Sequence, residues 1–153
     1  MEATNQTTKQ SSSETILHIT VTGMFTALIC VLAILTIPVQ PVPFTLALFA
    51  IFLTGALLKP KYAFLSVLCY LLIGAIGIPV YAGFKSGVGV LFSMTGGYLL
   101  SYPIMAWMIA MSIKLFHKRN FLSLGIGMLL ALFTCYFIGT LWFAYITGST
   151  ITY

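Results

Sequence analysis

The acidic side chains of this protein are confined to the start of the chain. Glu2 and Glu14 are the only two, so no aspartate or glutamate occurs from Thr15 to Tyr153. Charged residues make up 6% of the chain and hydrophobic residues 60%, whereas a soluble domain carries about 25% charged residues because its surface faces water. The chain is therefore expected to face lipid over most of its surface. A proton- or sodium-coupled transporter normally needs an intramembrane carboxylate, so the sequence also argues against that mechanism.

Apolar runs separated by short turns make up the rest of the chain. A helix needs about twenty apolar residues to cross a bilayer. The runs predict five transmembrane helices, over residues 16–37, 45–58, 62–78, 98–113 and 121–146. The expected fold is thus an all-α membrane domain over residues 15–153. The polar residues 1–14 precede it, and we expect them to form a flexible cytoplasmic tail.

Basic residues predict how the chain is oriented. The turn with Lys59 and Lys61 and the loop over residues 114–119 hold five basic side chains, and the loops over residues 38–44 and 79–97 hold only Lys85. Basic residues are more frequent on the cytoplasmic side, so the first two connections are expected inside and the last two outside. The net charge of +5 therefore indicates orientation, and we expect no nucleic-acid partner.

The two outer loops are the best candidates for a binding site. One is rich in proline and the other in glycine, which lets a backbone approach a ligand closely. Tyr81 and Tyr98 are expected to supply flat apolar walls for a small ring with polar edges. The alternative is a re-entrant loop that only packs helices. Lys85 either pairs with an anionic group of the substrate or is simply solvated.

Small residues line the first predicted span. Gly23 and Ala27 are four residues apart, on one helical face, and Thr22, Thr26 and Cys30 form a second stripe. Such spacing permits close approach of another helix.

No arrangement of side chains indicates catalysis. The three cysteines lie in apolar runs without metal-ligand spacing, and the two histidines have no serine or acid in a catalytic pattern near them. We therefore expect a protein that is not an enzyme and that holds no metal or cofactor.

Five segments in the expected order resemble the BioY family, the biotin-binding substrate-capture subunits (S components) of energy-coupling factor transporters. They are PVPFTL (41–46), GAIGIPVYAGF (74–84), GVGVLF (87–92), TGGYLLSY (95–102) and GTLWFAY (139–145). The resemblance implies a six-helix multi-pass protein of the bacterial cell membrane that binds biotin on the outer side. It also implies a membrane coupling subunit and two cytosolic ATPases as partners. This chain has no phosphate loop of its own.

The same resemblance assigns roles to residues of this chain. Gly23 and Ala27 are expected to face the coupling subunit. Lys85 is added as a candidate because it is the only outer charge. The expected substrate-binding residues are Phe44, Thr45, Tyr81, Gly83, Lys85, Gly87, Gly89, Thr95, Gly96, Gly97 and Tyr98.

The chain also departs from the family pattern. Ala47 stands where the family usually has glutamine, and Ser93 and Met94 replace a Gly-Pro pair. A sixth helix with its acidic and basic groups is not found, so the chain resembles a C-terminally shortened member. Two alternatives therefore stay open: an S component for another small vitamin, and a membrane remnant that binds nothing.

Overall fold

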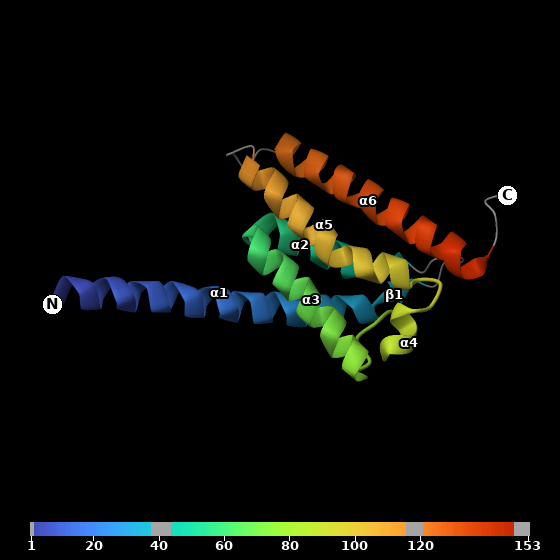
Figure 1. The fold of residues 1–153 in the computed structure, drawn as a ribbon, viewed down its shortest axis with the longest axis horizontal. Helices are drawn as coiled ribbons and strands as arrows, with labels where there is room; N and C mark the ends of the chain where they lie inside the picture. Colours follow the sequence, from blue (N-terminus) through green and yellow to red (C-terminus); the bar gives the residue numbers. More distant parts are fainter. Residues whose placement is uncertain (1, 38–43, 116–120, 149–153) are drawn as a thin grey trace.

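A computed structural model describes residues 2–37, 44–115 and 121–148 of the protein (Figure 1). Its elements, in chain order, are α1 (Glu2–Ile34), β1 (Thr36–Ile37), β2 (Phe44–Thr45), α2 (Ala47–Leu57), α3 (Pro60–Ile76), α4 (Val88–Leu91), α5 (Gly96–Leu115) and α6 (Phe121–Thr147). The predicted all-helical fold is confirmed, since α1, α2, α3, α5 and α6 overlap the five predicted helices, although residues 36–37 of the first predicted helix form β1. The two short strands and α4 were not predicted.

The first helix differs from its prediction at the N-terminal end. It begins at Glu2, so the segment predicted as a flexible tail is helical, and Figure 1 shows it projecting beyond the other helices. Residues 2–14 contain neither proline nor glycine, and extending an existing helix needs no new nucleation. The flexibility of this segment and its cytoplasmic location stay predictions.

Helix length sets how the protein lies in a membrane. The segments Ser13–Ile34, Gly96–Leu115 and Leu124–Ile146 are each long and apolar enough to span a bilayer, which identifies a membrane protein. By contrast, α2 has 11 residues and α3 has 17. At about 1.5 Å per residue, α2 reaches roughly 16 Å, about half of a 30 Å hydrocarbon core. The non-helical residues 44–46 therefore lead into α2 at membrane depth.

Backbone hydrogen bonds stabilise this non-helical entry. Strands β1 and β2 pair in antiparallel register, with Thr36 opposite Thr45, and the Leu46 amide donates to the Leu35 carbonyl at 3.2 Å. Irregular backbone at membrane depth is tolerated where protein buries it, and Thr45 is buried. The pairing thus places the start of α2 next to the end of α1.

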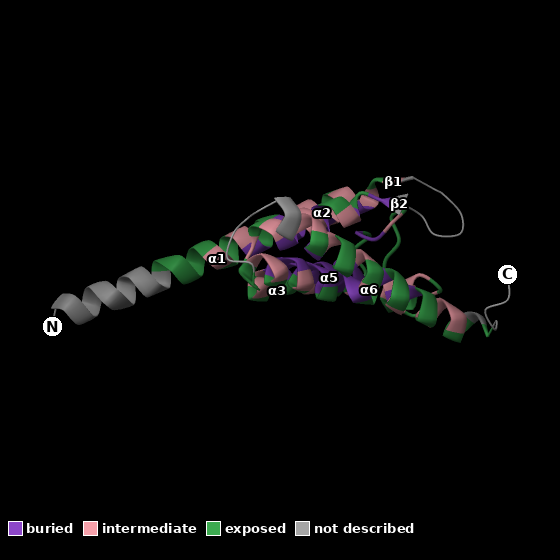
Figure 2. Ribbon diagram, turned by 90° about the horizontal axis from the view of Figure 1, so that it is seen from above, coloured by how far each residue is buried: buried purple, intermediate pink, exposed green. Residues whose placement is uncertain are grey.

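The core lies where α5 packs against α2, α3 and α6, and where α1 packs against α2 and α3. Figure 2 shows buried residues toward the inside of the bundle and exposed ones along its outer surface. Thr22 and Thr26, two residues of the second stripe, form hydrogen bonds with another helix of the same chain. The Thr26 hydroxyl donates to the Ser66 carbonyl of α3 at 3.0 Å, and the Ser66 hydroxyl donates to the Thr22 carbonyl at 3.2 Å.

The connections gather at two ends of the bundle. Figure 1 shows the turn between α2 and α3 at the same end as the close of α5, and β1 and α4 at the opposite end. We call the first the basic end, after Lys59, Lys61 and Lys114, and the second the hairpin end. The loop lysine and arginine residues after Leu115 and the loop over residues 38–43 lie outside the described residues. The grouping agrees with the predicted one, and the side that each end faces stays a prediction.

Candidate functional site

A small cavity lies at the hairpin end, where five elements and loops meet. Its volume is about 40 Å³. Its lining consists of hydroxyl-bearing and aromatic side chains with small apolar ones between them: Ala33, Thr45, Ala47, Tyr70, Ala82, Thr95, Tyr98, Leu99 and Tyr102. No lining residue is charged, so the cavity suits the neutral, ring-containing part of a small molecule.

The glycine-rich segment reaches the cavity through two tight turns. Gly77 ends α3 in the left-handed conformation, with φ of 118°. The chain then reverses between Tyr81 and Lys85, where Gly83 and Phe84 both have positive φ, 69° and 60°. The Gly87 amide donates to the Gly74 carbonyl at 2.8 Å. These bonds hold the turn against the end of α3 and bring Ala82 to the cavity wall.

Tyr81 supports the wall from behind. It is buried and its hydroxyl donates to the Leu71 carbonyl at 2.6 Å. Burial raises the pKa of this hydroxyl above its usual value. Its ring lies against the Cα of Gly74, where no side chain would fit, and meets Tyr70 edge-on with centroids 5.7 Å apart. Tyr81 therefore positions Tyr70.

Tyr70 is the functional candidate that the sequence did not reveal. It is 1% exposed and lines the cavity, yet its hydroxyl has no hydrogen-bond partner among the described residues. Buried hydroxyls are nearly always paired, so this donor is available to a bound molecule. Its only sequence signal is a tyrosine in the middle of an apolar helix, away from the membrane interfaces where tyrosine is enriched.

The first turns of α5 supply the opposite wall. Thr95, Tyr98 and Tyr102 recur every three or four residues, which places them on one helical face. Gly96 and Gly97 lie on another face and are packing positions: Gly96 touches the Leu91 carbonyl, and Gly97 touches the Trp142 side chain.

A hydrogen bond fixes this segment to α6. The Trp142 indole donates to the Ser93 carbonyl at 3.2 Å. Gly139 of α6 in turn lies against the ring of Tyr98. The end of α6 therefore positions Ser93 and Tyr98, of which Tyr98 lines the cavity.

The remaining predicted residues do not line the cavity. Gly83, Gly87 and Gly89 have open space where a side chain would be, and Lys85 is exposed. The Lys85 carbonyl accepts from the Tyr81 amide at 3.1 Å. Lys85 therefore belongs to the same tight turn as Ala82, the cavity residue three positions before it. The side chain of Phe44 lies outside the described part of the structure. The structure thus brings Thr45, Thr95 and Tyr98 together, and the roles of all the predicted residues stay predictions.

The cavity is small in this structure. Its 40 Å³ is close to the roughly 30 Å³ share of one water molecule, whereas small-molecule sites enclose about 300–1,000 Å³. The cavity must therefore widen before it can enclose a vitamin-sized molecule. Among the residues in the described ranges, no three histidine, cysteine or acidic side chains come together as metal ligands.

A separate groove follows the outer face of α1. Gly23 and Ala27 line it together with residues of α3, and a side chain added at Gly23 would meet nothing within 4 Å. Gly23 and Ala27 are exposed within the described chain, whereas Thr22 and Thr26, which also line the groove, are buried against α3.

Together, a helical membrane bundle and a neutral cavity at one end define the class of substrate-binding membrane subunits. A crystal structure of the S component for biotin from an ECF-type ABC transporter has the same fold, with a TM-score of 0.82, 28% identity, and coverage of 89% of this chain and 76% of that one. The sequence profile of the BioY family matches residues 4–153. The chain belongs to the BioY family.

Curated relatives agree with this assignment. A probable biotin transporter of Pyrococcus horikoshii is 36% identical over 131 residues, which cover 86% of this chain and 76% of the relative. A biotin transporter of Lactococcus lactis is 39% identical over 132 residues, which cover 84% of this chain and 70% of the relative. One from Thermotoga maritima is 49% identical over 89 residues, or 58% of this chain and 53% of the relative.

Proposed function

We propose that the chain captures biotin at the hairpin end and is the S component of an energy-coupling factor importer in a bacterial cell membrane. The observation that carries the proposal is the neutral cavity. The Tyr70 hydroxyl inside it has no partner among the described residues, and Lys85 lies beyond its rim. The names of the relatives and of the structural neighbour support biotin as the substrate.

The chemistry of biotin suits this arrangement. Its fused rings present a urea group with donors and an acceptor, and they need flat walls of the kind that Tyr98 and Tyr102 provide. The hydroxyl of Tyr70 is the available partner for the urea. The hydroxyls of Thr45 and Thr95 also line the cavity, but they already bond to Tyr102 and to Ser93 and would have to exchange those partners. The carboxylate at the end of the biotin chain would lie toward Lys85, where a charge-assisted hydrogen bond contributes about 1.5–3 kcal/mol.

Equilibrium binding of labelled biotin to the purified chain in lipid nanodiscs tests the proposal. We expect saturable binding that unlabelled biotin displaces. Tyr70→Phe should weaken it about fivefold to tenfold, because a hydrogen bond of about 1 kcal/mol is lost. Tyr145→Phe is the matched control, since Tyr145 is 85% exposed and is not among the residues that line this cavity.

Three outcomes separate the candidates. Displacement by another vitamin at lower concentration than biotin would favour the alternative substrate. No saturable binding by a chain that is folded in the nanodisc would favour the remnant. Equal affinities of the parent chain and Tyr70→Phe would remove Tyr70 from the site while leaving biotin as the substrate.

Transport requires partners that this chain does not supply. We propose that a membrane coupling subunit packs on the uncovered face of α1 at Gly23 and Ala27, and that two cytosolic ATPases act through it. Small residues allow such helices to approach closely, and the open space at Gly23 supports this face as the contact.

A further inference from the structure

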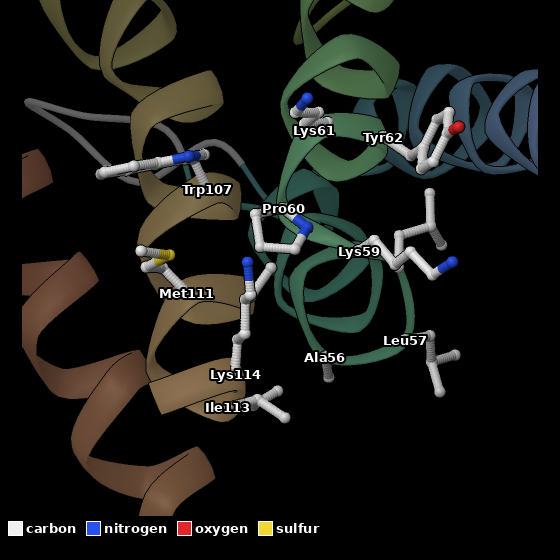
Figure 3. Close-up of a pocket in the computed structure, with 12 residues that line it drawn as sticks. Ala56, Leu57, Lys59, Pro60, Lys61, Tyr62, Trp107, Met111, Ile113 and Lys114 are labelled. Carbon is white, nitrogen blue, oxygen red and sulfur yellow. The ribbon is translucent and has the colours of Figure 1, made fainter. Parts of the chain in front are cut away.

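A large groove opens at the basic end, opposite the cavity. It lies between the turn that joins α2 to α3 and the last turns of α5, and its volume is about 600 Å³. Leu57, Pro60 and Met111 form apolar walls, and Trp107 lies along one side (Figure 3). A second hollow of about 510 Å³ continues from it, sharing Lys61 and Trp107 and adding Phe64 and Ile104. We call the two together the basic groove.

Three cations rim the basic groove. Lys59, Lys61 and Lys114 all belong to its lining, and in Figure 3 the side chain of Lys114 extends toward Pro60. Lys59 lies 3.1 Å from the Nε2 atom of His18. Within the described ranges, the amino groups of Lys61 and Lys114 have neither a hydrogen bond nor an ion pair. The only acids of the chain are Glu2 and Glu14.

The apolar part of the basic groove extends away from the charges. Phe64 is one helical turn beyond Lys61 on α3, and Ile104 is one turn before Trp107 on α5. Phe64 is 38% exposed and Trp107 is 43% exposed. In a membrane protein, lipid surrounds the helices that carry them. The groove therefore presents cations at the membrane boundary and an apolar channel at greater depth.

We propose that the basic groove binds one anionic phospholipid. Lys61 and Lys114 hold the phosphate, and an acyl chain lies in the hollow between Phe64 and Ile104. Charge complementarity selects an anionic headgroup, and the apolar hollow selects a lipid over a free phosphate. Basic pockets between membrane helices on the cytoplasmic side bind such headgroups, and this end is the one predicted to be cytoplasmic. The site is independent of the transported substrate.

The positions of the two tryptophans allow a direct test. Trp107 lies in the basic groove and Trp142 lies at the hairpin end, so Trp142→Phe leaves Trp107 as the sole reporter. The full chain would be placed in phosphatidylcholine vesicles containing either dibrominated phosphatidylglycerol or dibrominated phosphatidylcholine. Bromine quenches tryptophan fluorescence on contact, and the quenching curves give the relative association constants of the two lipids.

We expect phosphatidylglycerol to be preferred at Trp107, and the preference to fall as salt is added. Each lysine near a membrane surface strengthens binding of an anionic lipid by roughly fivefold. Lys61→Gln and Lys114→Gln should therefore each reduce the preference about fivefold. Lys85→Gln removes the same charge at the opposite end and should not change it. Trp107→Phe, which leaves Trp142, should show no preference between the lipids.

Specific results would overturn the proposal. Equal constants for the two lipids at Trp107, or a preference that Lys61→Gln and Lys114→Gln leave unchanged, would show that the lysines only solvate the membrane boundary. Displacement by soluble glycerol phosphate would identify a phosphate site without a lipid. Shielding of Trp107 from both lipids would indicate a protein occupant.

A second measurement avoids the tryptophan substitutions, because Trp142 also donates to Ser93. Native mass spectrometry of the parent chain, released from vesicles with equal amounts of the two lipids, should retain phosphatidylglycerol. Lys61→Gln should release it. Retention of both lipids in equal amounts would contradict the proposal.

Discussion

Lys85 is exposed on the turn whose neighbouring residue Ala82 lines the cavity. A lone lysine in an outer loop is often only solvated, and exposed ion pairs contribute about 0–1 kcal/mol. A charge-assisted contact to a bound carboxylate contributes about 1.5–3 kcal/mol. The difference between these ranges is large enough for a binding experiment to distinguish the two roles.

Lys85→Gln is therefore expected to weaken biotin binding by about tenfold or more, because the carboxylate loses its cation. Biotin methyl ester has no carboxylate, so its affinity should be the same for the parent chain and the variant. Competition binding with both ligands measures the four constants. If the substitution weakens the ester as much as biotin, or weakens neither, Lys85 does not contact the carboxylate.

At this scale the sequence predicted part of the cavity. Thr45, Thr95 and Tyr98 lie in segments that resemble the BioY family, and the structure places all three in the lining. Tyr70 lies in an apolar helix outside those segments and was not predicted. Tyr102 lies in the segment 95–102 but was not named, and only the packing of α3 on α5 brings the two tyrosines together. The packing roles of Gly96 and Gly97 were not visible either, since a glycine that approaches a ligand and one that approaches a tryptophan look alike in sequence.

The contact between α5 and α6 positions the cavity wall. Two glycines make it possible: Gly97 of α5 faces Trp142, and Gly139 of α6 faces Tyr98. Each helix thus offers a large ring to a glycine of the other. Their close approach places Tyr98 at the cavity.

Gly97→Ala should destabilise the protein. The added methyl group would overlap the Cβ atom of Trp142, which cannot rotate away, and overpacking costs about 1–3 kcal/mol. The better helix propensity of alanine offsets at most about 1 kcal/mol. Thermal unfolding in detergent should show a lower midpoint for this variant.

Gly125→Ala is the control for that comparison. A side chain at Gly125 meets nothing within 4 Å, so only the propensity gain remains and the midpoint should stay equal or rise. Equal unfolding midpoints for Gly97→Ala and Gly125→Ala would mean that α5 and α6 can move apart to fit the methyl group without a loss of stability.

The long elements followed from the sequence and the short ones did not. Apolar runs bounded by prolines, glycines and lysines predicted α1, α2, α3, α5 and α6. Two-residue strands and the four-residue α4 have too few residues to form a pattern, and they exist because the neighbouring helices hold their ends. The polar stretch before Thr15 was predicted without a helix, since its composition has no apolar period.

On the scale of the molecule, the two stripes of α1 have different uses. The Thr22 and Thr26 stripe bonds to α3, whereas the face of Gly23 and Ala27 is left open. A surface that is not needed to hold the chain together can be changed without loss of fold. If the proposed function holds, biotin binding and assembly with a coupling subunit are expected to be separable by substitution.

Gly23→Leu should leave biotin binding unchanged and reduce co-purification with the coupling subunit at least tenfold, because a bulky side chain prevents close helix approach. Gly125→Leu, at an equally open glycine of α6, should affect neither. The check is affinity purification of the tagged chain from cells that express all subunits, alongside the nanodisc binding measurement. Normal co-purification of Gly23→Leu would place the coupling subunit elsewhere.

The small cavity has a consequence for how affinity is distributed over the molecule. Only the fraction of molecules in which the cavity is already widened can enclose the vitamin. If that fraction is about one in a hundred, the measured Kd is roughly a hundred times the intrinsic one. Substitutions that favour the widened cavity would then lower the measured Kd without contacting the ligand. On that assumption, substitutions in the turns around the cavity are the ones expected to strengthen biotin binding.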